Sequence, residues 1–216
     1  MAPHRIGIFG GTFDPIHFGH ITPCKDLAQA LELEQIRLMP ANIPPHKANA
    51  HATSGHRLAM VKLVCQNEPL FVCDSRELNR QQASYTINSI VELATEYDNA
   101  QLFFFIGTDS LLNLHTWYQI DRLLQHCHFV VSTRPGYALT AMSDSPLVQR
   151  LTTDVEQVLA RPAGGILLVD TCQIDISSTQ IRQSIAQQQD VSAYLPDYIC
   201  KYIRENNLYQ LIDSVN

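Results

Sequence analysis

The chain has 216 residues, of which 45% are hydrophobic, and its formal net charge is −6 with the histidines neutral. This length fits one domain, or one domain with a small extension, with an ordinary globular core. No apolar run approaches the roughly 20 residues that span a bilayer, and the N-terminus lacks a signal-peptide pattern. We therefore expect a single domain over residues 1–216, a cytoplasmic location and no membrane partner. The acidic balance also argues against general nucleic-acid binding, which usually needs a basic excess.

The six cysteines are widely scattered and form no CxxC pair. Several stand in apolar surroundings, as Cys73 does after Phe71 and Val72. Buried reduced thiols are therefore predicted in preference to disulfides or a zinc site.

Short apolar runs alternate with stretches of helical periodicity along the chain. The predicted strands cover residues 5–9, 36–39, 70–73, 102–106, 129–132 and 166–169. The predicted helices cover residues 19–33, 54–67 with Ser54 as N-cap, a stretch from Ser84 or Thr86 to about 97, pieces between 110 and 126, 146–159, 179–187 and 197–206. Near-continuously apolar strands that alternate with helices predict the α/β class, with a Rossmann-like open parallel sheet, helices on both faces and a small C-terminal helical extension.

Unusual polar clusters follow the ends of the predicted strands. They occupy residues 10–20, 42–47, 107–109, 133–136 and 172–182. In an open parallel sheet, ligands bind beyond the carboxyl ends of the strands. A shared ligand site is therefore expected where these segments meet.

The segment from Gly10 to His20 predicts phosphate binding. Gly10 and Gly11 allow a tight turn after the first strand and bring backbone N–H groups close to an anion. His17 and His20 stand at the start of the next helix, where free N–H groups and the helix dipole attract phosphate. The spacing excludes both the GxGxxG fingerprint and the GxxxxGK[ST] loop. Alone, each fragment could be a surface turn, two surface histidines or half a metal site, but their order after a first strand favours phosphate handling.

The string GGTFDPIHFGH at residues 10–20 resembles the HxGH signature of the nucleotidyltransferase superfamily. Further motifs resemble, in the same order, those of bacterial nicotinate-nucleotide adenylyltransferases over nearly the whole chain. These are PPHK at residues 44–47, SYT at 84–86, GTDSLL at 107–112, TWY at 116–118, RPGY at 134–137 and ISSTQIR at 176–182.

The resemblance implies an activity and a cofactor. ATP and nicotinate mononucleotide would give deamido-NAD and pyrophosphate, a step of NAD biosynthesis, by direct in-line attack without a covalent enzyme intermediate. Mg²⁺ would be held mainly by substrate oxygens and water, so no protein metal ligand is assigned.

The resemblance also assigns residues to roles. His17 and His20 are the catalytic residues, at the transferring phosphate and the departing pyrophosphate. Assigned to ATP and its phosphates are Gly10, Gly11, Thr12, Phe13, Arg134, Ser178, Thr179 and Arg182. Assigned to the nucleotide substrate are Asp14, His46, Lys47, Thr86, Asp109, Trp117 and Tyr118. Trp117 would stack on the pyridine ring, while backbone N–H groups around Tyr118 and after Thr86 would hold the nicotinate carboxylate.

Residue type alone allows structural interpretations of the same positions. Ser178 or Asp109 could cap a helix, Arg134 and Arg182 could be surface charges, and Trp117 could pack in the core. Two functional alternatives also stay open. One is a sister transferase acting on nicotinamide mononucleotide or phosphopantetheine, or a cytidylyltransferase; the other is a non-catalytic nucleotide sensor on the same fold.

Overall fold

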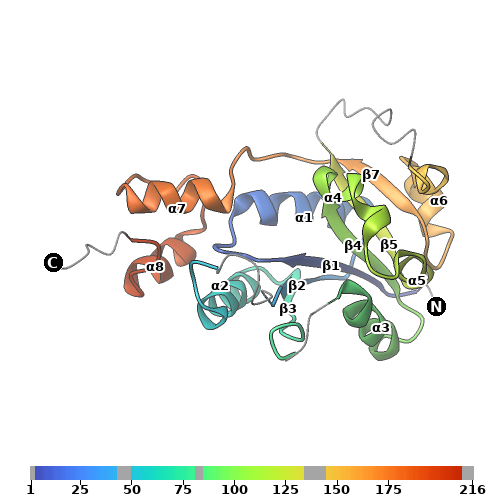
Figure 1. Cartoon of the computed structure of the whole chain (residues 1–216), viewed down its shortest axis with the longest axis horizontal. Coiled ribbons are helices and arrows are strands. Elements are labelled where there is room, and N and C mark those ends of the chain that lie inside the picture. The colour runs from blue at the N-terminus through green and yellow to red at the C-terminus, as the bar shows by residue number, and fades with distance from the viewer. Residues whose placement is uncertain (1–2, 43–49, 81–84, 134–144, 211–216) are drawn as a thin grey trace.

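The structure, a computed structural model, describes residues 3–42, 50–80, 85–133 and 145–210. Within these residues the chain forms a seven-stranded, all-parallel sheet in the order β3-β2-β1-β4-β5-β7-β6 (Figure 1). The strands are β1 (Arg5–Gly11), β2 (Gln35–Pro40), β3 (Phe71–Cys73), β4 (Gln101–Gly107), β5 (His128–Thr133), β6 (Leu151–Thr152) and β7 (Ile166–Asp170). The α-helices are α1 (Phe18–Leu31), α2 (Ser54–Asn67), α3 (Thr86–Glu96), α4 (Thr108–Leu112), α5 (Ile120–His126), α6 (Val155–Leu159), α7 (Ser178–Ala186) and α8 (Asp197–Glu205). The predicted Rossmann-like parallel sheet is confirmed.

Alternate side chains of the central strand β4 enter two different cores. Phe103 and Phe105 belong to the cluster to which α1 and α2 contribute. Phe104 and Ile106 belong to the cluster that α3 and α5 help to form. Because successive strand residues point to opposite faces, a strand that is apolar at every position needs helices on both sides. The continuous apolar run of β4 therefore explains its place in the middle of the sheet.

The strand order reverses at β1. This strand pairs with β2 on one side and with β4 on the other, so the chain first builds outward to β3 and then returns to build in the opposite direction. Crevices that hold ligands open at such switch points, outside the carboxyl ends of the strands. The segments that follow β1 and β4 are thereby brought to one edge of the sheet.

The C-terminal helices α7 and α8 lie together beyond α1 and α2 (Figure 1). α8 packs directly against α2, and its buried Ile199 and Ile203 join the same core cluster as α1. The predicted C-terminal helical extension is therefore present, and it reaches back to helices that immediately follow the first two strands.

The predicted helix at residues 146–159 is wrong. The chain forms the short 3-10 helix η3 (Val148–Arg150), then strand β6, and only then helix α6. Leu151 and Thr152 pair in parallel with Ile166 and Leu167 at the sheet edge. The Asp154 carboxylate accepts a hydrogen bond from the Gln157 N–H (3.2 Å) and so begins a new helix instead of continuing an old one.

Two predicted helix starts are corrected by one residue. Thr53, rather than Ser54, caps α2 by accepting a hydrogen bond from the His56 N–H (3.3 Å). Ser177, rather than Ser178, caps α7 in a capping box with Gln180. The hydroxyl of Ser178 is consequently available for another partner.

All six cysteines are free, as predicted. Cys24, Cys127 and Cys200 are buried, whereas Cys172 is exposed, so burial does not hold for every thiol. Of the helices in the described ranges, none combines the length and the apolar character needed to cross a membrane.

The imidazole of His128, at the start of β5, is fully buried and bonded on both nitrogens. Its Nδ1 accepts from the Gly165 N–H (3.1 Å), and its Nε2 lies 3.0 Å from the carbonyl oxygen of Arg161. The ring also stacks on Phe103, with 5.2 Å between centroids. Because a carbonyl can only accept, the proton sits on Nε2 and the ring is neutral. Burial lowers the pKa of His128.

This buried imidazole predicts a loss of stability in mild acid. Below the unfolded-state pKa of about 6.5, the unfolded chain binds a proton that folded His128 does not, so the free energy of unfolding falls as pH drops towards the folded pKa. His128→Gln, which does not titrate, should show a shallower decline, by up to about 1.4 kcal/mol per pH unit. Urea unfolding of both proteins between pH 7.5 and pH 5 measures this difference, and equal slopes would contradict it.

Candidate active site

A pocket of about 270 Å³ lies at the carboxyl edge of the sheet, at the switch point. Its walls come from the end of β1, the first turns of α1, the end of β4 with the following residues, and the ends of β5 and β7. The lining residues include Phe9, Gly19, His20, Pro23, Ile106, Gly107, Asp109, Ser132 and Gln173. Three of the predicted segments, residues 10–20, 107–109 and 172–182, therefore contribute to one site. Asp109 is exposed there in the first turn of α4, whose N-cap is Gly107, so Asp109 is not the cap.

The turn between β1 and α1 is held in a strained conformation. Phe13 has a φ of 50°, in the left-handed region that costs a non-glycine residue about 1 kcal/mol. Its ring is buried and packs edge-on against Phe9 (5.6 Å) and His20 (5.4 Å). Burial of the ring offsets the strain, and the ring becomes a wall behind the second histidine.

His17 and His20 stand together at the start of α1, as the sequence predicted. His17 is the N-cap, and the two ring centroids are 3.7 Å apart. The His17 N–H donates to His20 Nδ1 (3.3 Å), which leaves the ring proton of His20 on Nε2. His17 is only 4% exposed, and its Nδ1 has no hydrogen-bond partner in the described part of the chain.

Both histidines are neutral at physiological pH. Burial lowers the pKa of His17 to about 4. Burial, reinforced by the neighbouring His17, holds the pKa of His20 well below its ordinary value. Because a charged imidazole would lose its hydration here, the pair offers N–H donors and not two fixed positive charges.

Gly19 is required by the His17 ring. A Cβ at this position would lie 2.9 Å from both Cε1 and Nδ1 of His17 and 3.3 Å from Cγ2 of Ile176. Glycine is therefore needed here for the packing of His17. Gly19 also lines the pocket at the switch point.

Arg57 holds the turn from the α2 side and was missed from the sequence. This residue is 2% exposed, and its Nη1 donates to the carbonyl oxygens of Thr12 (2.7 Å) and Ala41 (3.0 Å). Burial lowers the pKa of Arg57, while the Asp14 carboxylate opposes that effect. One signal was present in the sequence, because Arg57 stands three and four residues before Met60 and Val61, on the buried face of the helix.

Asp14 turns inward rather than towards the pocket. Its buried carboxylate accepts hydrogen bonds from the N–H groups of His51 (2.7 Å) and Ala52 (3.1 Å) and from the Tyr209 hydroxyl (2.8 Å). In this arrangement Asp14 fixes its own turn, and its predicted contact with the nucleotide substrate stays a prediction.

The predicted phosphate-binding residues of α7 also contact this turn. Ser178 Oγ donates to the Pro15 carbonyl (3.0 Å), and Arg182 Nη1 donates to the Asp14 carbonyl (2.7 Å). A second hydrogen bond joins Arg182 Nη2 to Thr179 Oγ1 (3.2 Å). Arg182 is therefore not a free surface charge, and α7 begins directly beside the β1–α1 turn.

Three of the residues predicted for the nucleotide substrate, Thr86, Trp117 and Tyr118, lie at the start of α3 or directly after η1 (Leu114–Thr116). Thr86 is the first residue of α3. The exposed rings of Tyr85 and Tyr118 are in contact, tilted by 38° with 4.5 Å between centroids, which places Thr86 close to Tyr118. Trp117 is half-buried and meets Phe104 and Phe129 edge-on. Its core-packing interpretation is therefore correct, while stacking on a pyridine ring stays a prediction.

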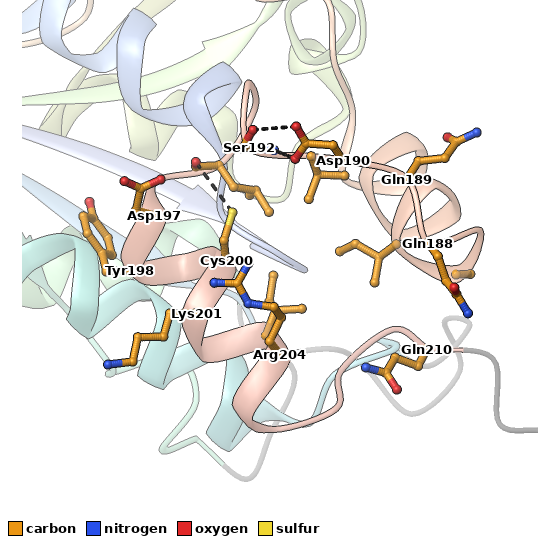
Figure 2. A pocket seen from close by; sticks show the side chains of 15 residues that line it. Gln188, Gln189, Asp190, Ser192, Asp197, Tyr198, Cys200, Lys201, Arg204 and Gln210 are labelled. Carbon is orange, nitrogen blue, oxygen red and sulfur yellow. Dashed lines mark hydrogen bonds between the residues drawn. The ribbon is translucent and has the colours of Figure 1, made fainter.

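The remaining predicted residues, His46, Lys47 and Arg134, lie outside the described ranges. A larger pocket of about 1080 Å³ lies between α7 and α8 (Figure 2). It is lined by side chains such as Gln188, Asp197, Lys201 and Arg204, and by none of the residues predicted for catalysis or nucleotide binding. Pocket size alone would therefore have pointed away from the histidine pair.

Solved structures with the same fold include two of a Plasmodium falciparum nicotinic acid mononucleotide adenylyltransferase. The complex with NaAD has a TM-score of 0.69 at 18% identity, and the complex with APC has a TM-score of 0.68 at 17% identity. Each comparison covers 95% of this chain and 97% of the other. Residues 8–184 match the family model described as cytidylyltransferase-like. The fold, the HxGH site and this match together define a cytidylyltransferase-like nucleotidyltransferase.

Curated relatives narrow the assignment. A protein from Aeromonas salmonicida is 44% identical, over 97% of this chain and 99% of its own length. A protein from Shewanella frigidimarina is 42% identical, over 95% of this chain and its full length. Both are described as probable nicotinate-nucleotide adenylyltransferases. This chain belongs to the nicotinate-nucleotide adenylyltransferase family.

The packing of Gly19 against His17 predicts the effect of a single methyl group. Gly19→Ala should lower the free energy of unfolding by about 1–3 kcal/mol, because the buried His17 ring must shift. Gly55→Ala is a matched control, since Gly55 is also the second residue of its helix and a Cβ there meets nothing closer than 3.7 Å. Thermal unfolding of the two variants checks this. Equal stability would show that the His17 ring has room to move.

Proposed function

We infer that this protein transfers the adenylyl group of ATP to nicotinate mononucleotide, giving deamido-NAD and pyrophosphate in NAD biosynthesis. The observation that carries the inference is the neutral His17–His20 pair, held at the N-terminus of α1 beside the pocket. Family membership supports the choice of reaction, and the pair supplies the chemistry.

The pair suits charge that develops on phosphate oxygens. His20 lines the pocket and carries its ring proton on Nε2. The neutral ring can therefore donate a hydrogen bond without any change of protonation. The first turn of α1 adds backbone N–H groups and the positive end of the helix dipole. Donors placed before the reaction begins cost no reorganisation in the transition state, and one such donor contributes about 10²–10³-fold to kcat.

The reaction needs no enzyme nucleophile. A phosphate oxygen of the mononucleotide attacks the α-phosphorus of ATP, and the bond from that phosphorus to the bridging α–β oxygen breaks in line. Pyrophosphate leaves with the electron pair of that bond. His20 and His17 stabilise the reacting and departing oxygens, while Thr12 and the backbone of Gly11 and Phe13 orient the phosphates.

The ATP side is completed by a second helix N-terminus. The first turn of α7 brings Ser178, Thr179 and Arg182 beside the β1–α1 turn, where they can reach the β- and γ-phosphates. Imidazole, hydroxyl and backbone N–H groups are better suited to binding phosphate oxygens than to binding a hard metal cation. Within the described ranges there is no group of three or more His, Cys, Asp or Glu side chains that could hold a metal. We propose that Mg²⁺ is carried by ATP oxygens and supplies charge neutralisation there.

The acceptor side favours an acid. α3 begins at Thr86, and the side chain of its N-cap, Tyr85, accepts no hydrogen bond from the first turn. N–H groups at a helix N-terminus, together with the dipole, stabilise a carboxylate. Tyr118 and Trp117 stand beside this turn and can enclose the pyridine ring. Asp109, at the end of β4, can accept from ribose hydroxyls.

Removal of His20 tests the catalytic claim. His20→Ala should reduce kcat by about 10²–10³-fold, because one preorganised donor is lost at the phosphates. His4→Ala is a suitable control, since His4 is an exposed histidine beside Glu34 at the amino end of β1. Initial rates of pyrophosphate release with ATP, Mg²⁺ and nicotinate mononucleotide provide the measurement. Near-normal turnover by His20→Ala would refute the proposed mechanism.

The acceptor is tested with a substrate panel. We expect kcat/KM for nicotinate mononucleotide to exceed that for nicotinamide mononucleotide by at least about 100-fold, because the amide leaves carboxylate-binding donors unpaired. Phosphopantetheine should be a still poorer acceptor, and CTP a poorer donor than ATP. Comparable kcat/KM values for acid and amide would favour a sister transferase. Tight ATP binding without turnover on any acceptor would favour a nucleotide sensor.

A further inference from the structure

The chain that follows α8 doubles back in an unusual conformation. Asn207 and Tyr209 both adopt left-handed backbone, with φ of 50° and 64°. Each such residue costs about 1 kcal/mol, so the surrounding structure must compensate. Leu208, between them, packs against the core cluster, and its N–H donates to the Ile203 carbonyl (3.0 Å). The strained return places the Tyr209 side chain against the β1–α1 turn.

Tyr209 contacts the β1–α1 turn through one specific hydrogen bond. The Tyr209 hydroxyl donates to Asp14 Oδ1 (2.8 Å), across 195 positions of sequence. Burial raises the pKa of Tyr209, and the neighbouring Asp14 charge adds to the effect, so the hydroxyl keeps its proton. A donor that never ionises is suited to hold a buried carboxylate permanently.

Asp14 occupies the middle of the turn that presents the phosphate donors. Three donors from two distant segments fill its carboxylate, namely the N–H groups of His51 and Ala52 and the hydroxyl of Tyr209. Three residues before the first histidine, this carboxylate sets the path of the backbone from Thr12 to His17. Tyr209, Thr179 and Arg182 all line another pocket of about 540 Å³. The tyrosine therefore also adjoins the α7 residues proposed to bind phosphate.

We propose that Tyr209 is a positioning residue for adenylyl transfer, which fixes the β1–α1 turn through Asp14 without touching the substrate. The proposal rests on the function inferred above. Displacement of reacting groups by about 1 Å can cost about 10²-fold in rate, so a turn that loses one of its anchors should lose turnover before it loses binding. The inferred function assigns the pyridine ring to Trp117 and the ribose to Asp109, away from Tyr209, so we expect KM to be largely independent of this anchor.

Tyr202 offers a matched control within the same C-terminal unit. It lies on α8 and is half-buried, like Tyr209, and its hydroxyl lies 2.9 Å from His56 Nδ1 on α2. Tyr202→Phe removes a hydroxyl that links the C-terminal segment to α2, whereas Tyr209→Phe removes a hydroxyl that links it to Asp14 in the β1–α1 turn. Only the second change alters a group bonded to the β1–α1 turn.

The experiment compares wild type, Tyr209→Phe and Tyr202→Phe in kcat, in KM for ATP and nicotinate mononucleotide, and in Tm. We expect Tyr209→Phe to lower kcat about 10-fold with both KM values within about 2-fold of wild type. Tyr202→Phe should lower Tm by a similar amount and leave kcat within about 2-fold. Unchanged kcat in Tyr209→Phe, or an equal loss in Tyr202→Phe, would overturn the positioning role.

A readout that does not depend on activity separates this proposal from the inferred function. The backbone N–H groups of Phe13, Asp14, Ile16 and His17 should exchange hydrogen at least about 10-fold faster in Tyr209→Phe than in wild type or Tyr202→Phe. If wild type catalyses no transfer, the inferred function fails, while the exchange rates still report on the anchor. If wild type is active and neither kcat nor exchange changes in Tyr209→Phe, the positioning role alone fails.

Discussion

The carboxylate of Asp14 is taken out of water at the point where the first strand, the start of α2 and the C-terminal segment meet. A buried charge costs several kcal/mol unless donors replace its lost hydration. Here two backbone N–H groups and one phenol supply that replacement. Because the donors come from parts of the chain far apart in sequence, the charge is satisfied only when the whole fold is assembled. Because Asp14 needs these donors, the β1–α1 turn becomes ordered only when the whole domain has folded.

The proposed catalytic pair, His17 and His20, depends on this order. Phe13 is held in the left-handed region, its ring walls in His20, and Arg57 fixes the Thr12 carbonyl beside it. With the turn rigid, His17 and His20 are packed too tightly to remain charged, and they become neutral donors. Electrostatic stabilisation by preorganised dipoles is effective in such a site because little solvent competes with it. The burial of the pair and its proposed role in catalysis therefore follow from the same packing.

Several elements could be predicted because their determinants are local. The apolar runs that became β1, β2 and β4, and the histidines at the start of α1, depend on residues adjacent in sequence. Predictions failed where a partner distant in sequence determines which structure a segment adopts. Residues 146–159 contain an edge strand because β7 offers unpaired hydrogen-bonding groups to Leu151 and Thr152. For Trp117 the sequence allowed both core packing and stacking on a ligand; its edge-on contacts with Phe104 and Phe129 show the first, and the second stays a prediction.

The amino-acid sequence by itself determined the class of fold and the family, and it predicted the phosphate-handling segment, because alternating apolar runs and the GGTFDPIHFGH string are short-range features. Only the tertiary structure showed that the His17 ring leaves no space for a side chain at Gly19 and that Asp14 faces inward. It also showed that Arg57, Arg182 and Tyr209 all bond to one turn. The contacts of Arg57, Arg182 and Tyr209 with this turn join residues separated by 45 to 195 positions. Such pairings leave no periodic trace in a single sequence, since they are fixed by the shared need of buried polar groups for partners once the sheet and helices have packed.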